Sequence, residues 1–297
     1  MKKIVICTGA NGGIGRNYSK EMLQNDYHVI LAVRNEKSGN LLVSQLKGEF
    51  PDGSMEVMIV DMGSLKSIDQ FAKNVLAKHN RLDVLAHNAG VYFFDKERRT
   101  SADGIELNLA IHFIGPYALT AKLFPLLKST LNSRVVSMSS TEHSGNPVDL
   151  NDVQMEKEFS KFGNMKAYAR SKWATLAFTN ELHNRITKAK LKIKAIGAHP
   201  GVSITGIQHS GNPNGFQKAV IWVIGKLFAG KPEDAAKPLA MASLIGESGE
   251  FYGPTGFKEF KGKPGKVSPD PETKKEQYGT ALWNKAEELT GINFDLN

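Results

Sequence analysis

Short apolar runs alternate with amphipathic stretches from the first residues onward, and this alternation is the strongest constraint on the fold. Strands that alternate with helices form βαβ units, and their right-handed crossovers place helices on both faces of a parallel sheet. The β-like runs are Lys3–Thr8, His28–Val33, Glu56–Val60, Leu82–His87, Arg134–Ser139 and Leu191–Ala198. The helical stretches are Ile14–Asn25, Leu65–His79, Ala102–Leu127 and Ala167–Lys188. The sequence predicts an α/β fold with a doubly wound parallel sheet of about seven strands.

The length of 297 residues permits one large domain or two small ones. The chain shows no internal repeat and no low-complexity linker, but its character changes after Pro200. A polar, turn-rich segment at 206–215 is followed by an apolar one at 216–228, and a helix-like pattern returns at Lys274–Leu289. We therefore expect a single domain over residues 1–297, with a substrate-lid region at about 206–230 and a C-terminal extension at about 252–297.

The net charge of +8 raises the question of nucleic-acid binding. The 38 Lys and Arg residues are scattered, and no basic block is interleaved with aromatic residues. The clusters at 188–194 and 258–266 are typical of solvated faces and loops. We therefore expect no nucleic-acid partner, and the excess positive charge favours attraction of an anionic small molecule.

The single Cys7 cannot form an internal disulfide, so no oxidising compartment is implied. The apolar run Ile4–Cys7 is far shorter than the roughly 7–15 residues that a signal peptide needs. No run approaches the roughly 18 apolar residues of a membrane-spanning helix. We expect a cytoplasmic protein without a membrane span, although Lys218 and Lys226 beside apolar residues leave peripheral membrane contact open.

A glycine-rich turn joins the first predicted strand to the first predicted helix. Its sequence is Thr8-Gly9-Ala10-Asn11-Gly12-Gly13-Ile14-Gly15, with spacing TGxxxGxG. Glycine lets the backbone turn sharply and approach a pyrophosphate closely, and the helix N-terminus presents free N–H groups to the anion. The turn predicts a Rossmann-type dinucleotide site in which Thr8, Gly9, Asn11, Gly13, Ile14 and Gly15 contact the cofactor.

The end of the second strand indicates which dinucleotide is preferred. An acidic residue there would bind the ribose hydroxyls of NAD, but this chain has Arg34, with Lys37 close behind. A guanidinium pairs well with a 2′-phosphate. The residues therefore predict NADP(H) in preference to NAD(H). Glu36 works against this prediction, and an idle surface role for Arg34 stays open.

A tyrosine and a lysine share one face of a predicted helix. Tyr168 and Lys172 are separated by four residues, in Tyr168-Ala169-Arg170-Ser171-Lys172. A phenol titrates near 10, and a neighbouring ammonium favours the phenolate and lowers that value. A hydroxyl from Ser139-Ser140, at the end of the fifth strand, could hold a substrate oxygen while Tyr168 exchanges its proton.

The sequence resembles the short-chain dehydrogenase/reductase family over nearly its whole length, and within it the branch of retinol dehydrogenases and WW-domain oxidoreductases. The motifs that carry the resemblance are TGANGGIG at 8–15, Val60-Asp61-Met62, His87-Asn88-Ala89-Gly90, SMSS at 137–140, YARSK at 168–172, HPGVSIT at 199–205 and YGPTGFKEFKGKPG at 252–265.

The resemblance implies cofactor contacts along the carboxyl ends of the strands. Asp61 and Met62 would flank the adenine. Asn88 would steady the central region of the cofactor, beside Ala89 and Gly90. The nicotinamide carboxamide would be held by Pro200, Gly201 and Thr205.

It also implies the catalytic roles. Ser140, the second serine of its pair, matches the catalytic serine, and Tyr168 matches the general acid/base. Lys172 would bind the nicotinamide ribose and tune Tyr168. Relatives of this kind are usually dimers or tetramers, which implies a homo-oligomer. No metal site is expected.

One position departs from the family pattern. His112 aligns where the family carries a catalytic asparagine that helps to hold a water chain from the lysine, and Asn108 falls a full turn earlier. The imidazole could take over the proton relay, or it could leave the relay broken. We expect replacement of His112 by Asn to keep or raise turnover.

These residues predict an oxidoreductase that transfers hydride between NADP(H) and a small-molecule carbonyl or alcohol substrate. The apolar segment at 216–228 favours a lipophilic substrate of the retinoid, steroid, aldehyde or ketone type. The alternative, allowed by His112, is a catalytically impaired NADP(H)-binding regulatory protein.

Overall fold

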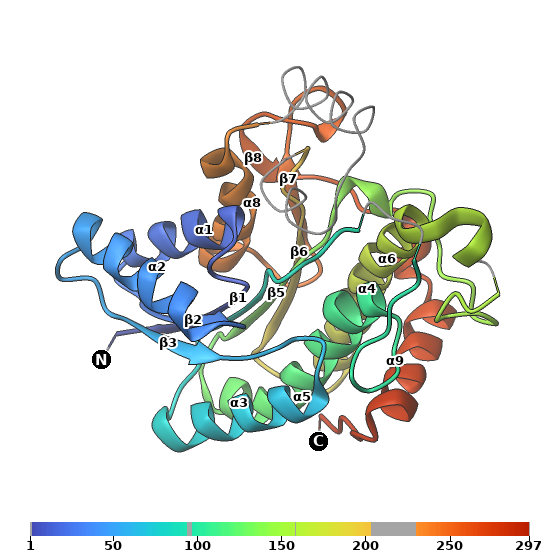
Figure 1. Cartoon of the computed structure of the whole chain (residues 1–297), viewed down its shortest axis with the longest axis horizontal. Helices are drawn as coiled ribbons and strands as arrows, with labels where there is room; N and C mark the ends of the chain where they lie inside the picture. The colour runs from blue at the N-terminus through green and yellow to red at the C-terminus, as the bar shows by residue number, and fades with distance from the viewer. Residues whose placement is uncertain (1, 94–96, 158, 203–229, 297) are drawn as a thin grey trace.

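The computed structural model describes residues 2–93, 97–157, 159–202 and 230–296 (Figure 1). The predicted lid at 206–230 lies outside these residues apart from Gly230, and Thr205 lies outside them as well. The described strands form one sheet in the order β3-β2-β1-β4-β5-β6-β7-β8. The chain reverses direction across the sheet between β1 and β4, which is the topological switch point where doubly wound folds bind ligands.

The first seven strands in chain order pair in parallel, and β8 pairs antiparallel with β7. The prediction of an α/β fold with about seven parallel strands is therefore confirmed, with a short antiparallel edge strand in addition. The strands are β1 (Ile4–Thr8), β2 (His28–Val33), β3 (Met55–Ile59), β4 (Val84–His87), β5 (Arg134–Met138), β6 (Lys194–Ala198), β7 (Phe251–Pro254) and β8 (Pro264–Lys266).

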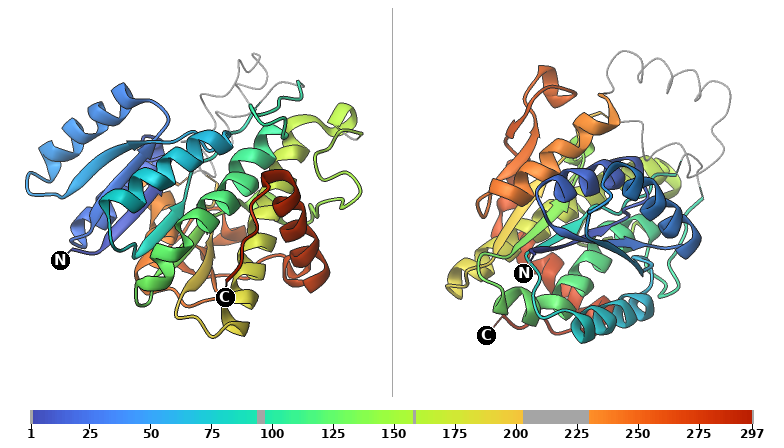
Figure 2. Two further views of the ribbon diagram at one scale, coloured as in Figure 1. Left: turned by 90° about the horizontal axis from the view of Figure 1, so that it is seen from below. Right: turned by 90° about the vertical axis from the view of Figure 1, so that its left-hand side faces the viewer.

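Helices cover both faces of the sheet (Figures 1 and 2). Ile4 and Ile6 of β1 pack into a core shared with α3, α5, α6 and α9. Their neighbours Val5 and Cys7 face the opposite core, shared with α1, α2 and α8. This alternation explains why β1 is apolar throughout, since both of its faces are buried. The longer helices are α1 (Gly13–Gln24), α2 (Glu36–Glu49), α3 (Leu65–Lys78), α5 (Gly115–Ser129), α6 (Phe159–Lys188), α8 (Pro232–Ile245) and α9 (Glu276–Thr290).

Two of these helices, α2 and α8, were not expected from the sequence. α2 contains two glycines, Gly39 and Gly48, which lower helix propensity. Gly39 is required by packing, because a Cβ there would lie 2.7 Å from Cγ1 of Val57. α8 carries Pro238 in its interior, which is typical of a helix end rather than of a helix.

The helix predicted at Ala102–Leu127 begins five residues later than expected. Residues 101–105 form a turn, in which Ser101 N donates to Ile105 O at 2.7 Å. The Glu106 carboxylate then caps the short helix α4 (Leu107–Leu109), accepting from the N–H groups of Asn108 and Leu109. A π-helical segment, η1 (Ala110–Ile114), continues from α4 into α5. A π-helix is rare and frequently lies at a functional site, and this one contains His112.

The continuous segment Leu107–Ser129 bears on the expectation that the chain has no membrane span. Its length and mean hydropathy of 1.2 would allow it to cross a membrane, although no uninterrupted apolar run in the sequence suggested such a segment. In the structure 83% of its most apolar window is buried within the protein. Packing against the sheet and neighbouring helices accounts for its apolar character.

The C-terminal segment is tied to helices α5 and α9 by an aromatic cluster. Figure 2 shows the last residues, in dark red, running back beside α9. Phe294 packs on Trp283 of α9 at 4.9 Å and on Phe124 and Tyr117 of α5 at 5.0 and 5.7 Å between ring centroids. It is 3% exposed. The C-terminal extension therefore contributes directly to the core formed by α5 and α6.

Replacing Phe294 with Ala tests whether the extension and the sheet fold as one unit. A buried Phe→Ala change leaves a cavity and costs about 3–5 kcal/mol of unfolding free energy. We expect one cooperative urea transition at a lower midpoint. Leu131→Ala, at a position 68% exposed, is the control and should change stability by less than about 0.5 kcal/mol. An unchanged midpoint for Phe294→Ala would contradict this account.

Candidate active site

The glycine turn between β1 and α1 has the close backbone approach that its sequence predicts. Gly9 adopts φ +66°, and a Cβ there would lie 2.8 Å from Cα of Ala89. A Cβ on Gly15 would lie 2.3 Å from the Gly9 carbonyl oxygen. Gly12 is the N-cap of α1, and it has no side chain with which to cap this helix end. The turn therefore fits a bound pyrophosphate, because Gly13, Ile14 and Gly15 begin a helix whose first N–H groups have no intrahelical acceptor.

Hydrogen bonds fasten this turn to the end of β4. The Thr8 hydroxyl accepts from the N–H groups of Asn88 and Ala89 at 3.0 and 3.1 Å. The Asn88 amide donates to the carbonyl oxygens of Thr8 and Gly9 at 3.0 and 3.3 Å. The motifs TGANGGIG and HNAG, 80 residues apart in sequence, therefore form one rigid floor at the switch point. The Asn88 side chain thus holds the backbone of the glycine turn in its conformation.

The end of β2 presents the charges predicted to select the cofactor. Arg34 and Lys37 are exposed, and neither makes a hydrogen bond or ion pair within the described part of the chain. Asn11 of the glycine turn donates to the Ser38 hydroxyl at 3.1 Å, which places the start of α2 beside the turn. Two cations thus lie near the mouth of the glycine turn with their donor groups available to an anion.

The residue pair predicted to flank adenine follows β3. Asp61 Oδ1 accepts from the Gly63 N–H at 2.9 Å, which holds the backbone in a turn. Met62 is buried, and its carbonyl oxygen would be 2.3 Å from a Cβ on Gly115. The backbone of this turn therefore packs directly on the start of α5, which fixes its position at the carboxyl end of β3.

The segment after β6 lies at the same edge of the sheet. Gly201 has φ +71°, and a Cβ there would meet the Phe260 carbonyl oxygen at 2.4 Å. The Gly201 N–H donates to Nδ1 of the buried His199 at 3.2 Å. Pro200 and Gly201 thus form a tight corner at the carboxyl end of the sheet.

The two serines that follow β5 have different environments. The Ser139 hydroxyl donates to the Lys172 carbonyl oxygen at 2.9 Å, so it fastens the strand to α6. The Ser140 hydroxyl accepts from the Glu142 N–H at 3.3 Å and interacts with the Tyr168 phenol. Ser140 rather than Ser139 is therefore the hydroxyl available beside Tyr168, as the motif alignment predicts.

Tyr168 lies in an aromatic corner that keeps its ring in place. Edge-to-face contacts join it to Tyr92 at 5.1 Å and to His112 at 5.4 Å between ring centroids. Burial raises the pKa of Tyr168 to about 12, and the hydrogen bond with Ser140 acts against this rise. In the protein alone, the phenol is therefore a protonated donor at neutral pH.

Lys172 projects from the same face of α6 as Tyr168. Its Nζ donates to the Met138 carbonyl oxygen at 2.9 Å and lies 5.8 Å from the Tyr168 ring centroid. Burial lowers the pKa of Lys172 to about 7. The pair is brought together as predicted, although the ammonium is held by the strand and not by the phenol oxygen.

His112 is fixed by two protein partners. Its Nε2 accepts from the Val91 N–H at 3.0 Å, and its Nδ1 lies 2.8 Å from the Ser171 hydroxyl oxygen. The Ser171 hydroxyl donates to the Tyr168 carbonyl oxygen at 2.7 Å, so Nδ1 must be the donor to Ser171. Burial, followed by the nearby Lys172 charge, holds the pKa of His112 well below its usual value. The imidazole is therefore neutral.

The site also contains residues that the motifs did not single out. Thr175 bridges η1 and α6, because its hydroxyl oxygen lies 2.9 Å from the carbonyl oxygens of both His112 and Ser171. Ser171, inside the YARSK motif, supports His112. A polar side chain on the buried face of the helix that carries Tyr168 was the available sequence signal. Gly90 is close to both groups, since a Cβ there would lie 3.2 Å from His112 Nε2 and 3.5 Å from Lys172 Nζ.

Gly15→Ala tests the phosphate cradle. The added methyl meets backbone atoms at 2.3 and 2.8 Å, so the turn must shift. We expect at least a tenfold loss of NADPH affinity, measured by fluorescence titration, and a destabilisation of about 1–3 kcal/mol. Gly48→Ala is the matched control, because a Cβ there meets nothing within 4 Å. Unchanged NADPH affinity in Gly15→Ala would show that the turn does not bind the phosphates.

His112→Asn tests whether the imidazole relays protons or positions its neighbours. An Asn amide can keep the Ser171 contact, but it leaves the Val91 N–H without its acceptor, at a cost of about 1 kcal/mol of stability. We expect turnover to be retained and the pH profile between 5.5 and 7.5 to keep its shape, because the imidazole does not titrate there. A step near pH 6.5 that disappears in the variant would establish a relay role.

The chain matches known proteins along its whole length. Residues 3–151 match the short chain dehydrogenase family. Human retinol dehydrogenase 13 is 31% identical over 292 residues, covering 98% of this chain and 85% of that protein. Human retinol dehydrogenase 11 is 33% identical over 236 residues, covering 79% and 70%.

Solved structures show the same fold. An uncharacterized protein from Mycobacterium paratuberculosis is similar with a TM-score of 0.80 and 27% identity, covering 100% of this chain and 96% of that one. Salutaridine reductase from Papaver somniferum has a TM-score of 0.64 at 22% identity, covering 84% and 99%. Together with the glycine turn and the joined Ser140, Tyr168 and Lys172 side chains, these matches confirm the resemblance: the chain belongs to the short-chain dehydrogenase family of oxidoreductases, in the branch that contains the retinol dehydrogenases.

Proposed function

We propose that the protein is an NADP(H)-dependent oxidoreductase that interconverts a lipophilic alcohol and its carbonyl compound. The observation that carries this proposal is the assembly of Ser140, Tyr168 and Lys172 beside a glycine cradle at the switch point of the sheet. When bound, the nicotinamide supplies or accepts the hydride. The residues of this chain supply the orientation and the proton.

The proton chemistry follows from the two hydroxyl groups. Ser140 and Tyr168 would donate hydrogen bonds to the same carbonyl oxygen, which polarises it for attack at carbon. Tyr168 then gives its proton to that oxygen as the alcohol forms. In the protein alone burial holds the phenol in its protonated form, which is the form that carbonyl reduction needs. The positive charge of Lys172 stabilises the phenolate that remains.

The preference for NADP(H) rests on charge. A 2′-phosphate carries negative charge that Arg34 and Lys37 can pair with from the end of β2, beside Asn11 and Ser38. Solved structures of similar fold include NADP complexes, such as one of RhlG from Pseudomonas aeruginosa at 17% identity and a TM-score of 0.62. Glu36 is also exposed nearby and would repel the 2′-phosphate. The proposed selectivity for NADP(H) therefore requires that the attraction of the two cations exceed the repulsion of this one carboxylate.

The substrate class is proposed from the relatives. Those of about 30% identity over nearly the full chain are named retinol dehydrogenases, which indicates an extended apolar alcohol or aldehyde. The predicted roles of Thr205 and of the apolar segment at 216–228 belong to the same proposal. Location in the cytoplasm and assembly into a homo-oligomer remain predictions.

Tyr168→Phe tests the function directly. The change removes only the phenol oxygen, so we expect NADPH binding to persist and reduction of retinaldehyde, long-chain aldehydes and steroid ketones to fall by at least a hundredfold. Tyr27→Phe, at the amino end of β2, is the control for loss of a phenol and should leave turnover unchanged. A wild-type protein that binds NADPH but reduces none of these carbonyl compounds would instead favour the regulatory alternative.

Arg34→Ala tests the cofactor preference. Loss of a charged hydrogen-bond partner for the phosphate costs about 1.5–3 kcal/mol, so the KM for NADPH should rise at least tenfold while that for NADH stays unchanged. Lys192→Ala removes the same charge from the exposed loop before β6 and is the matched control. Equal effects on the two cofactors would contradict the role given to Arg34.

A further inference from the structure

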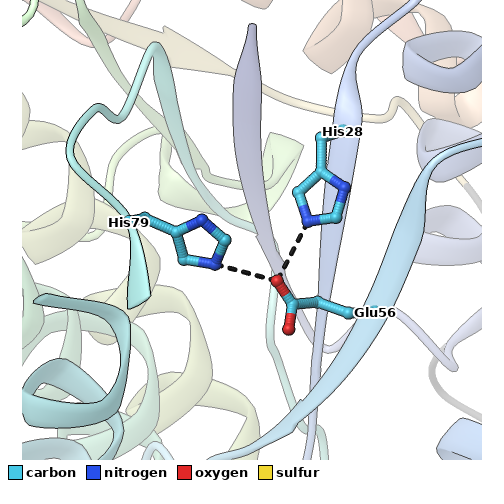
Figure 3. A group of neighbouring side chains, drawn as sticks. All are labelled: His28, Glu56 and His79. Atoms are coloured by element: carbon cyan, nitrogen blue, oxygen red, sulfur yellow. Dashed lines mark hydrogen bonds and ion pairs between the residues drawn. The ribbon is translucent and has the colours of Figure 1, made fainter. Parts of the chain in front are cut away.

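A second cluster of functional side chains lies at the amino end of the sheet, away from the glycine turn. His28 is the first residue of β2, Glu56 lies in the edge strand β3, and His79 follows the last residue of α3. Each offers one nitrogen or oxygen, and these three atoms lie within 4.8 Å of one another. Figure 3 shows both imidazole rings directed at the same carboxylate. The proposed reaction uses none of these residues.

The geometry of the cluster converges on one point. Nε2 of His28 and Nε2 of His79 lie 2.9 and 2.8 Å from the same oxygen, Glu56 Oε1. Nε2 of His79 is buried and makes no hydrogen bond among the described residues, although Glu56 Oε1 lies within ion-pair distance of it. The buried Nε2 of His79 is therefore left without a hydrogen bond beside the oxygen that His28 also contacts, and an ion shared by the three atoms would satisfy it.

The supporting contacts are those that a metal site requires. Nδ1 of His28 lies 2.8 Å from the Ser54 hydroxyl, which can accept a hydrogen bond from Nδ1–H; in that tautomer the Nε2 lone pair is free. The second carboxylate oxygen, Glu56 Oε2, is held by Lys78, so Oε1 is oriented toward the two rings. Burial lowers the pKa of His79, which favours the neutral imidazole. Orientation of ligands by such outer contacts is common in metal sites.

The two histidines of the cluster border a surface hollow. His28, Glu56 and His79 side chains are 20%, 16% and 10% exposed. A surface hollow of about 500 Å³ is lined by His28, His79 and Asn80 among others. Two imidazoles and one carboxylate suit Zn²⁺ better than Mg²⁺ or Ca²⁺, which prefer oxygen ligands.

We propose that His28, Glu56 and His79 bind a divalent transition metal of the Zn²⁺ type, with water as the fourth ligand. The nitrogen–oxygen separations would open from 2.8–2.9 Å to roughly 3.3 Å around an ion with ligand distances of about 2.0–2.1 Å. The ion ties the edge strand β3 to β2 and to the end of α3. Among the described strands β3 lies at an edge of the sheet and pairs with β2 alone, so such a tie would stabilise it.

The test is a metal titration of tag-free protein that has first been stripped with EDTA. We expect one equivalent of Zn²⁺ to bind by calorimetry, and Co²⁺ to give the visible absorption of a tetrahedral site. Binding should raise the melting temperature by a few degrees and slow amide hydrogen exchange in residues 54–60. His28→Asn, His79→Gln and Glu56→Gln should each weaken binding at least tenfold, while circular dichroism and NADPH binding confirm that the variants are folded.

Two further variants separate a metal site from a cluster of ion pairs. Lys78→Met removes a competing cation from Glu56, so metal affinity should stay the same or increase. His183→Gln removes a half-buried histidine that is paired with Ser248 elsewhere, and it should leave binding unchanged. Absence of Zn²⁺ binding at 100 µM, or binding that the His28 and His79 variants do not weaken, would overturn the proposal.

Discussion

The burial of one ammonium group is the constraint on which the active site depends. Lys172 is 4% exposed, and among the described residues no carboxylate pairs with it; its Nζ donates to the Met138 carbonyl oxygen. Removing a cation from water without a counter-charge favours the neutral form, which is why its pKa falls to about 7. Because the unfolded chain binds this proton more tightly, the group lowers stability fully below pH 7. This penalty fades as the pH rises toward the usual value near 10.5.

A buried group whose pKa is strongly shifted, at a cost in folding stability, is characteristic of catalytic sites. The same burial raises the pKa of Tyr168 to about 12, so desolvation moves the two groups in the directions that disfavour both charges. The pair therefore loses its first proton, that of Lys172, near neutral pH, and in the protein alone the phenol keeps its own. A negatively charged substrate oxygen or a positively charged nicotinamide can shift these protonation states. The neutral His112 makes two hydrogen bonds, which hold Val91 and Ser171 in place beside this pair.

Much of the fold followed from local patterns. The strands at His28–Val33 and Arg134–Met138 were placed almost to the residue because both faces of the sheet are covered, which produces continuous apolar runs. α2 and α8 were not predicted from the sequence, because Gly39 and Pro238 within them lower helix propensity. The late start of α4 depends on a side-chain cap by Glu106, which periodicity does not record.

The site shows the same division. The motif alignment brought together the glycine turn, Asn88, Ser140, Tyr168 and Lys172, because each belongs to a strand end or helix face that the fold must place at the switch point. The neutral state and orientation of the His112 imidazole could not be predicted from the sequence. They depend on hydrogen bonds with Val91, 21 residues before it, and Ser171, 59 residues after it. The cluster of His28, Glu56 and His79 was likewise invisible, because strand register and the end of α3 bring distant residues together.

The dependence of Tyr168 on Lys172 is tested most directly by single-turnover oxidation of an alcohol substrate by NADP⁺ between pH 6 and 11. In the wild type, the rate of hydride transfer should rise with a midpoint near 7, where the pair loses its first proton. In Lys172→Met, the isolated phenol must ionise by itself, so the midpoint should move upward by at least two pH units. An unchanged midpoint in the variant would contradict the account, because it would show that the ammonium does not govern the phenol.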